Sequence, residues 1–214
     1  MKHIVLAASA ALGLAAGSAS AVPVASHLGR VVSAPGVLKG HVLCENNGTD
    51  SGTGIASETF TDFSGYDSSG AADCRIKAAA FVTEVDTLGQ YFNGSGPANS
   101  VTLTIYKDKG GLPGKVVAAY PGLAYTDSTG VGGLDVKFKR TLLTKGTYWF
   151  AVQPSMTFAA GGQWGWELQS EAVGAADLWE EQGGLGTGCL TWAVTYDCVG
   201  YAGDYMFIAR GIGE

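Results

Sequence analysis

The sequence predicts an all-β protein, folded as an antiparallel β-sandwich of the jelly-roll kind and stabilised by disulfide bonds. Three observations support this fold class. Several short segments have the two-residue period of strands, glycine-rich turns separate them, and only 15% of the residues are charged while 33 are glycines. No long window after the N-terminus has the apolar stripe of an amphipathic helix. Short strands with regular glycine punctuation are typical of sandwiches and jelly rolls.

The strand segments differ in how they divide polar from apolar side chains. Residues 101–106, 134–139 and 163–169 alternate, so each is expected to have one buried face and one wet face. On that pattern Trp164, Trp166 and Leu168 share the core face, and Glu167 points to solvent. Residues 147–152 and 204–209 are apolar on both faces, which predicts a central strand and a closing strand. A short helical turn is expected around residues 175–179.

The first 21 residues have the pattern of a secretory signal peptide. A basic start is followed by an apolar run of small residues and by an Ala-x-Ala site, which predicts cleavage after Ala21. The alternative is an N-terminal membrane anchor, but the apolar run is short for about 30 Å of hydrocarbon. We therefore expect a secreted or periplasmic product with no membrane span. A flexible arm is expected at 22–57 and the sandwich domain at 58–214.

Export determines how the four cysteines are interpreted. An even number in an oxidising compartment indicates disulfides, and four cysteines allow three pairings. We favour the local pairs Cys189–Cys198 and Cys44–Cys74. A metal site is the competing interpretation, but the chain has no C-x2-C motif.

Three groups of motifs carry a family resemblance. They are residues 90–98 leading into 101–106 and 110–114, residues 143–153 followed by 161–166, and residues 186–189 followed by Trp192, Cys198 and 204–208. Together they resemble a β-sandwich accessory module of bacterial secreted and cell-surface proteins. The resemblance implies a local bridge between Cys189 and Cys198 and carries no catalytic residues. Where the family usually has an acidic pair this chain has Asp73-Cys74, and this departure supplies the extra cysteine that Cys44 would join.

The composition argues against several function classes. A formal charge of −6 disfavours nucleic-acid binding, which needs a basic face. A Ser-His-Asp triad needs an imidazole near the nucleophile, yet after cleavage only His27 and His41 remain, both in the expected arm. Glycoside hydrolysis needs only two carboxyl groups, and Glu167, Glu180 and Glu181 lie near tryptophans. Of these, Glu180 and Glu181 are expected in a solvated loop.

Two further patterns are candidates for ligand binding. Asp62 and Asp67 lie in a loop rich in oxygen ligands, so calcium is the one cofactor we consider, against the alternative of ordinary Asx turns. The aromatic residues offer flat rings on which sugars could pack, and Trp192 and Tyr196 lie inside the short loop between Cys189 and Cys198. Tyr91 and Phe92, beside a glycine-rich turn, form a second candidate group.

The preferred hypothesis is therefore a non-catalytic exported β-sandwich with a binding or structural role at the cell surface or outside the cell. An extracellular glycan or another surface polymer is the expected partner, and the oligomeric state is left open. The alternative is a small secreted glycoside hydrolase that uses paired carboxylates. A third hypothesis is a stable spacer or surface-layer component without a ligand.

Overall fold

Strands make up most of the chain in the computed structural model, which describes residues 40–213. They form three sheets that pack over a shared hydrophobic core, and nearly all neighbouring strands run antiparallel. The predicted all-β sandwich is thereby confirmed. The signal peptide, its cleavage site and His27 lie outside the described residues.

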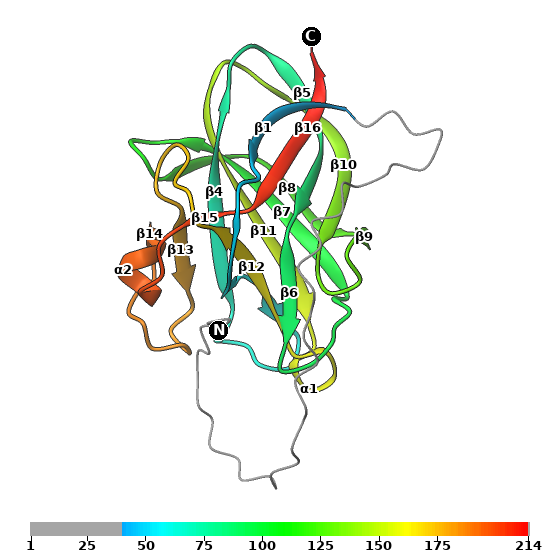
Figure 1. Cartoon of the computed structure of the whole chain (residues 1–214), viewed down its shortest axis with the longest axis vertical. Helices are drawn as coiled ribbons and strands as arrows, with labels where there is room; N and C mark the ends of the chain where they lie inside the picture. Colours follow the sequence, from blue (N-terminus) through cyan, green and yellow to red (C-terminus); the bar gives the residue numbers. More distant parts are fainter. Residues whose placement is uncertain (1–39, 214) are drawn as a thin grey trace, which may run out of the picture.

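The first sheet brings the two ends of the described chain together. Its order is β1 (His41–Asn46), β16 (Phe207–Gly213), β5 (Ala80–Thr87), β10 (Leu134–Leu143) and β9 (Tyr125–Asp127). Strand β1 forms one edge and pairs antiparallel with β16, and the two lie side by side in Figure 1. The start of the chain's sandwich is therefore fixed to its last strand.

The second sheet is the largest and supports the candidate site described below. Its order is β14 (Ala193–Val194), β13 (Leu178–Glu181), β4 (Ser68–Ile76), β11 (Gly146–Met156), β7 (Ser100–Asp108) and β8 (Pro113–Leu123). The short β3 (Thr59–Phe60) pairs in parallel with the end of β11. The predicted central strand at 147–152 lies within β11, which has β4 on one side and β7 on the other.

The third sheet is built around β12 (Gln163–Gln169), which pairs with β15 (Asp204–Tyr205), β2 (Asp50–Ala56) and β6 (Gly89–Phe92). Two short helices complete the described elements, α1 (Phe158–Gly161) and α2 (Thr195–Val199). In Figure 1, α2 lies beside β13 and β14 at one side of the molecule. Among the described residues no helix has the length and apolar composition needed to cross a bilayer.

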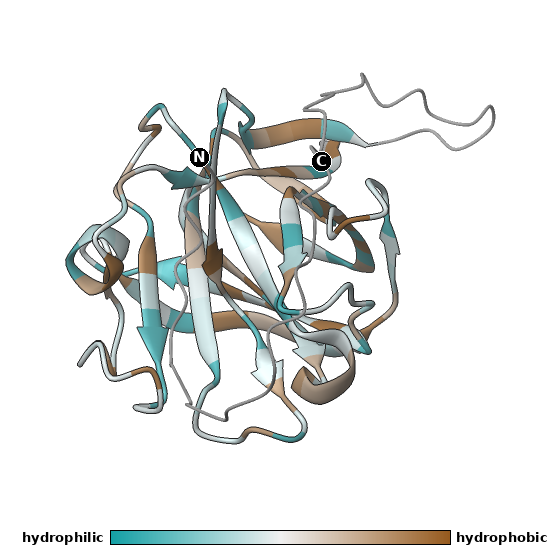
Figure 2. Cartoon of the chain, turned by 60° about the horizontal axis from the view of Figure 1, so that its bottom comes forward, coloured by the Kyte–Doolittle hydropathy of each residue, from teal (hydrophilic) through white to brown (hydrophobic). Residues whose placement is uncertain are grey.

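The core forms where the apolar faces of the strands meet. Along several strands hydrophilic and hydrophobic bands alternate in Figure 2, as expected where one face is wet and the other is packed. Trp164 and Trp166 are fully buried, with ring centroids 6.1 Å apart, so the prediction that they fill the core is confirmed. The Trp166 ring also stacks on Tyr205 at 4.7 Å.

Both disulfides join the cysteine pairs that the sequence favours. Cys44 on β1 is bonded to Cys74 on β4, so this bond connects the first sheet to the second. Cys189 is bonded to Cys198 on α2 and closes the loop that leads from β13 to β14. Two disulfides are compatible with an oxidising, non-cytoplasmic compartment.

Three expectations about local structure need correction. The arm expected at 22–57 contains β1 and β2 in its described part, because the glycine-rich segment pairs with β12. Glu167 is only 3% exposed, since β12 is buried on both faces, and alternation along a strand does not show what covers its polar side. Residues 178–181 form β13 where a helical turn was expected, because they pair antiparallel with β4.

Candidate functional site

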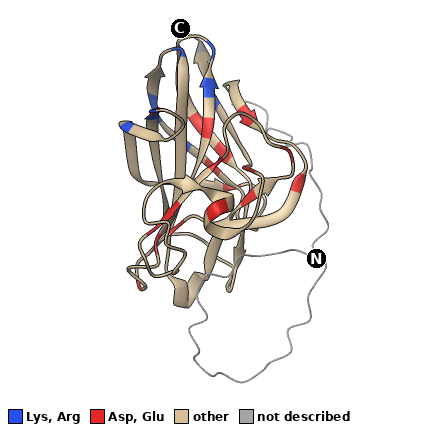
Figure 3. Ribbon diagram, turned by 90° about the vertical axis from the view of Figure 1, so that its left-hand side faces the viewer, with Lys and Arg blue, Asp and Glu red and all other residues tan. Residues whose placement is uncertain are grey.

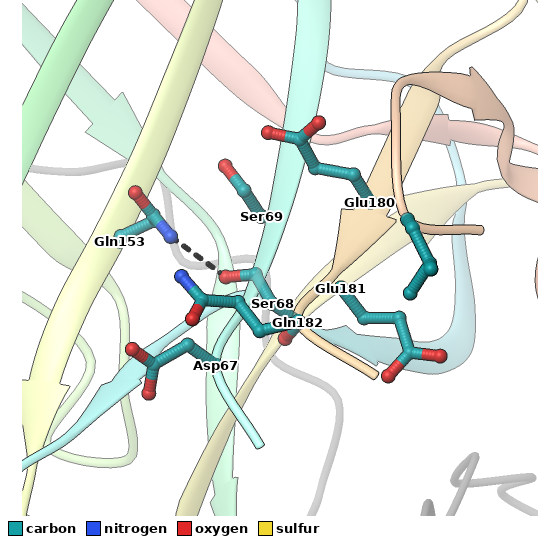
Figure 4. A pocket seen from close by; sticks show the side chains of 8 residues that line it. Asp67, Ser68, Ser69, Gln153, Glu180, Glu181 and Gln182 are labelled. Atoms are coloured by element: carbon teal, nitrogen blue, oxygen red, sulfur yellow. Dashed lines mark hydrogen bonds between the residues drawn. The ribbon is translucent and has the colours of Figure 1, made fainter. Parts of the chain in front are cut away.

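A cavity of about 400 Å³ opens at the second sheet, where β4 begins and β13 ends. Figure 4 shows the side chains of its wall projecting from three neighbouring strands. Most of these side chains are polar. The lining residues are Asp67, Ser68, Ser69, Gln153, Glu180, Glu181, Gln182 and Leu190.

The hollow results from strand register and side-chain size. Glu180 of β13 lies opposite Ser69 of β4, so the two share a face of the sheet. On the other side of β4, Ala151 of β11 pairs with Ala71, and two residues further along each strand Gln153 and Ser69 share that face. The short Ser69 therefore forms the floor between two longer side chains, Glu180 and Gln153, as Figure 4 shows.

Glu181 organises the rim of the cavity. Its buried carboxylate accepts hydrogen bonds from the backbone N–H groups of Gly183, Leu185 and Thr187, at 3.0, 2.8 and 2.9 Å, and from the Thr187 hydroxyl at 3.0 Å. Desolvation by burial raises the pKa of Glu181, but these hydrogen bonds outweigh it and leave the pKa below its usual value. Glu181 is therefore ionised and holds the segment 182–187 in place.

Glu180 is the half-buried carboxyl group of the site. Desolvation raises its pKa, and the backbone N–H of Trp192 opposes this effect. Burial also raises the pKa of the Tyr106 hydroxyl, with a further contribution from the charge of Glu180. Tyr106 and Trp192 meet edge to face, with ring centroids 5.9 Å apart. One carboxyl group and two aromatic rings thus lie close together on this face of the sheet.

The start of β4 contributes a carboxylate and a buried hydroxyl. Asp67 Oδ1 accepts the N–H of Phe60 at 2.8 Å, and the Asp67 carbonyl accepts the N–H of Gln182 at 3.0 Å. The Gln153 side chain donates to the Ser68 carbonyl at 2.8 Å. Ser68 is 2% exposed, and its Oγ has no hydrogen-bond partner among the described residues. Because a buried hydroxyl without a partner is costly, this atom marks a place for a polar ligand.

The aromatic residues singled out in the sequence fall in different places. Tyr196 is 58% exposed on α2, whereas Trp192 is partly buried against Tyr106. Tyr91 is half-buried, and its hydroxyl contacts the Tyr125 hydroxyl at 3.4 Å. Phe92 is buried in the core and presents no face to solvent. Of these four residues, Trp192 lies nearest to the site, through its contact with Glu180.

The two acidic residues considered for calcium do not act together. Asp62 accepts the backbone N–H groups of Phe158 and Ala159, at 2.8 and 3.0 Å, while Asp67 belongs to the cavity wall. The described residues contain no group of three or more His, Cys, Asp or Glu side chains arranged to hold a metal ion. Asp62 therefore fixes the first turn of α1 and fits the Asx-turn alternative.

Several wall residues were not identified from the sequence. Ser68, Ser69, Gln153, Gln182 and Leu190 carry no motif, although the run of small residues at 68–72 could have indicated a shallow floor. Glu180 and Glu181 were expected in a solvated loop, but they lie on β13, where Glu181 is buried and Glu180 half-buried. The preceding Leu178 and Trp179, both buried, were the available signal for a strand.

Comparison with known proteins identifies no relative. No protein-family model matches the chain, and neither a curated protein nor a solved structure is similar to it. The family resemblance of the sequence motifs therefore stays a prediction, and the geometry of the cavity is the basis for a functional assignment.

Proposed function

We propose that this chain is an exported, non-catalytic β-sandwich module that binds a hydroxyl-rich polymer, such as a glycan, in the cavity beside β4, β11 and β13. The observation that supports this most directly is the buried Ser68 hydroxyl in the wall, which has no hydrogen-bond partner among the described residues. A ligand hydroxyl would satisfy it.

The rest of the wall suits the same chemistry. A sugar hydroxyl both donates and accepts hydrogen bonds, so it matches a surface that mixes carboxylates, amides and serine hydroxyls. Small-molecule sites typically combine such polar groups with aromatic or apolar surface. Here Trp192 and Tyr106 supply that surface next to Glu180, and Leu190 supplies it at the rim.

Export is supported by the N-terminal pattern at 1–21 and by two disulfides that suit an oxidising compartment. The resemblance to accessory modules of secreted bacterial proteins agrees with a binding role. A structural role at the cell surface is compatible with the same fold, but it would leave the Ser68 hydroxyl without a partner.

The test is direct binding. Residues 22–214 are screened on a glycan array and by polysaccharide pull-down, and we expect retention on at least one polymer. Gln182→Ala removes an exposed amide of the wall and is expected to weaken binding by about three- to tenfold, as loss of one hydrogen bond does. Retention on no polymer, or an unchanged affinity of Gln182→Ala, would contradict the proposal.

A second candidate is a glycoside hydrolase with paired carboxylates, favoured by one observation. Glu180 is half-buried with a raised pKa, as a general acid requires, and Asp67 lies in the same cavity. Chromogenic glycosides distinguish the two candidates. A hydrolase turns them over and loses turnover in Glu180→Gln, whereas a binding module shows no turnover in either form.

A further inference from the structure

The cavity carries more negative charge than a neutral sugar needs. Three of its eight lining residues are acidic, and none is Lys, Arg or His. The carboxylate of Glu181 is held ionised by its hydrogen bonds to the 182–187 segment. A ligand that enters this cavity therefore meets a fixed negative charge on Glu181 and the carboxyl groups of Asp67 and Glu180.

The cations of the protein lie elsewhere. Lys77 and Lys145 are exposed in the turns that join β4 to β5 and β10 to β11. Arg210 is bonded to Asp86 at 2.7 Å, and the Lys107 Nζ atom lies 4.2 Å from the Tyr148 ring centroid. Figure 3 shows blue bands gathered toward the C-terminal end and red bands over the rest of this side. No basic residue lines the cavity to neutralise it.

We infer that the ligand of this cavity carries free primary amines, and that its chemical class is a polymer of amino sugars. This rests on the proposed function, because it specifies which hydroxyl-rich polymer the cavity selects. An ammonium group has three donors and no acceptor, so it fits a wall that offers carboxylate oxygens and a Ser68 hydroxyl without a partner. The sugar hydroxyls match Ser69, Gln153 and Gln182.

Glu180 is the residue best placed to select the amine. It is half-buried beside Trp192 and Tyr106, so an opposite charge there is screened less than it would be on an open surface. An ammonium group beside Glu180 favours the ionised carboxylate and opposes the desolvation that raises its pKa. Charge-assisted hydrogen bonds of this kind are about twice as strong as neutral ones.

The experiment compares matched oligosaccharides by titration calorimetry with residues 22–214, in roughly 0.15 M salt to screen unspecific attraction. The ligands are a glucosamine oligomer, the same oligomer fully N-acetylated, a glucose oligomer of equal length and an oligolysine. We expect the glucosamine oligomer to bind at least tenfold more tightly than the other three. Glu180→Gln should reduce that preference about tenfold and leave the affinity for the acetylated oligomer unchanged.

Controls keep the outcomes distinct. Glu45→Gln removes an exposed carboxylate on β1, in the other layer, and should change nothing. Asp67→Asn keeps an Oδ1 acceptor for Phe60 and provides a second charge variant if Glu180→Gln is unstable. Equal affinity for all three sugars, or a preference for oligolysine, overturns the amino-sugar inference. Binding of no sugar at all overturns the proposed function itself.

Discussion

Two glycines determine how closely large rings approach the strands. A Cβ atom at Gly89 would lie 2.4 Å from the Trp164 indole, and one at Gly70 would lie 2.7 Å from the Tyr205 ring. Both rings are fully buried, so neither can move away without disturbing its neighbours. Glycine is required at these positions because the backbone itself forms the surface on which the rings pack.

At this scale we predict that Gly89→Ala lowers the free energy of unfolding by about 1–3 kcal/mol, the usual cost of overpacking a core. Urea denaturation measures the change. Gly54→Ala is the matched control, because its Cβ would lie 3.4 Å from the Gly165 backbone, an ordinary contact distance. A loss at Gly54 as large as that at Gly89 would contradict the explanation.

At the scale of elements, β1 depends on bonds formed far away in the sequence. It is an edge strand of the first sheet, held on one side by β16 and through Cys44 by the disulfide to Cys74 on β4. An edge strand has an unpaired row of backbone groups, so a covalent link limits its fraying.

We predict that the double variant Cys44→Ser/Cys74→Ser loses about 2–4 kcal/mol of stability, because the bond closes a separation of 30 residues in the unfolded chain. The variant Cys189→Ser/Cys198→Ser should lose less, since that bond closes a separation of 9 residues. Thermal melting of both variants under oxidising conditions provides the comparison. The reverse order would show that native-state contacts, and not loop length, dominate the effect.

The strands that could be predicted were those whose own residues carry the pattern. Strand β12 and the core of β7 follow the two-residue period, and β11 is apolar on both faces. The strands β1 and β2 were missed, because glycine, serine and asparagine have weak strand propensity and are placed here by pairing partners more than 100 residues away.

The candidate site was less predictable for the same physical reason. Asp67 and Glu180 could be singled out as acids, but their presence in one cavity depends on the register between β4 and β13. The floor depends on Ser69 lying between two longer side chains, and its neighbours Glu180 and Gln153 are far apart in sequence. No local pattern contains that information, because long-range register is set by the fold as a whole.

At the scale of the whole molecule, buried acids make stability depend on pH. Burial raises the pKa of Glu58 to about 8 and that of Asp73 to about 6. The pKa of the buried Asp177 is raised by desolvation and by the charge of Asp204, whose own pKa is raised by burial. Groups of this kind bind protons more tightly in the folded state than in the unfolded chain.

A pKa raised on folding means that stability falls as pH rises from the unfolded value toward the folded value. We therefore predict that the melting temperature is highest near pH 5 and decreases steadily to about pH 8, the pKa of Glu58. Glu58→Gln should flatten the decrease above pH 6, because the amide does not titrate. Calorimetric melts at several pH values measure it, and a melting temperature that rises over this range would contradict the assignment.

The distribution of tryptophan has a practical consequence for spectroscopy. Trp149, Trp164, Trp166 and Trp179 are at most 1% exposed, whereas Trp192 is partly exposed and lies against Glu180 and Tyr106. A water-borne quencher such as iodide therefore reaches mainly the indole that adjoins the cavity. Emission from this single fluorophore makes occupancy of the cavity observable in the unlabelled native chain.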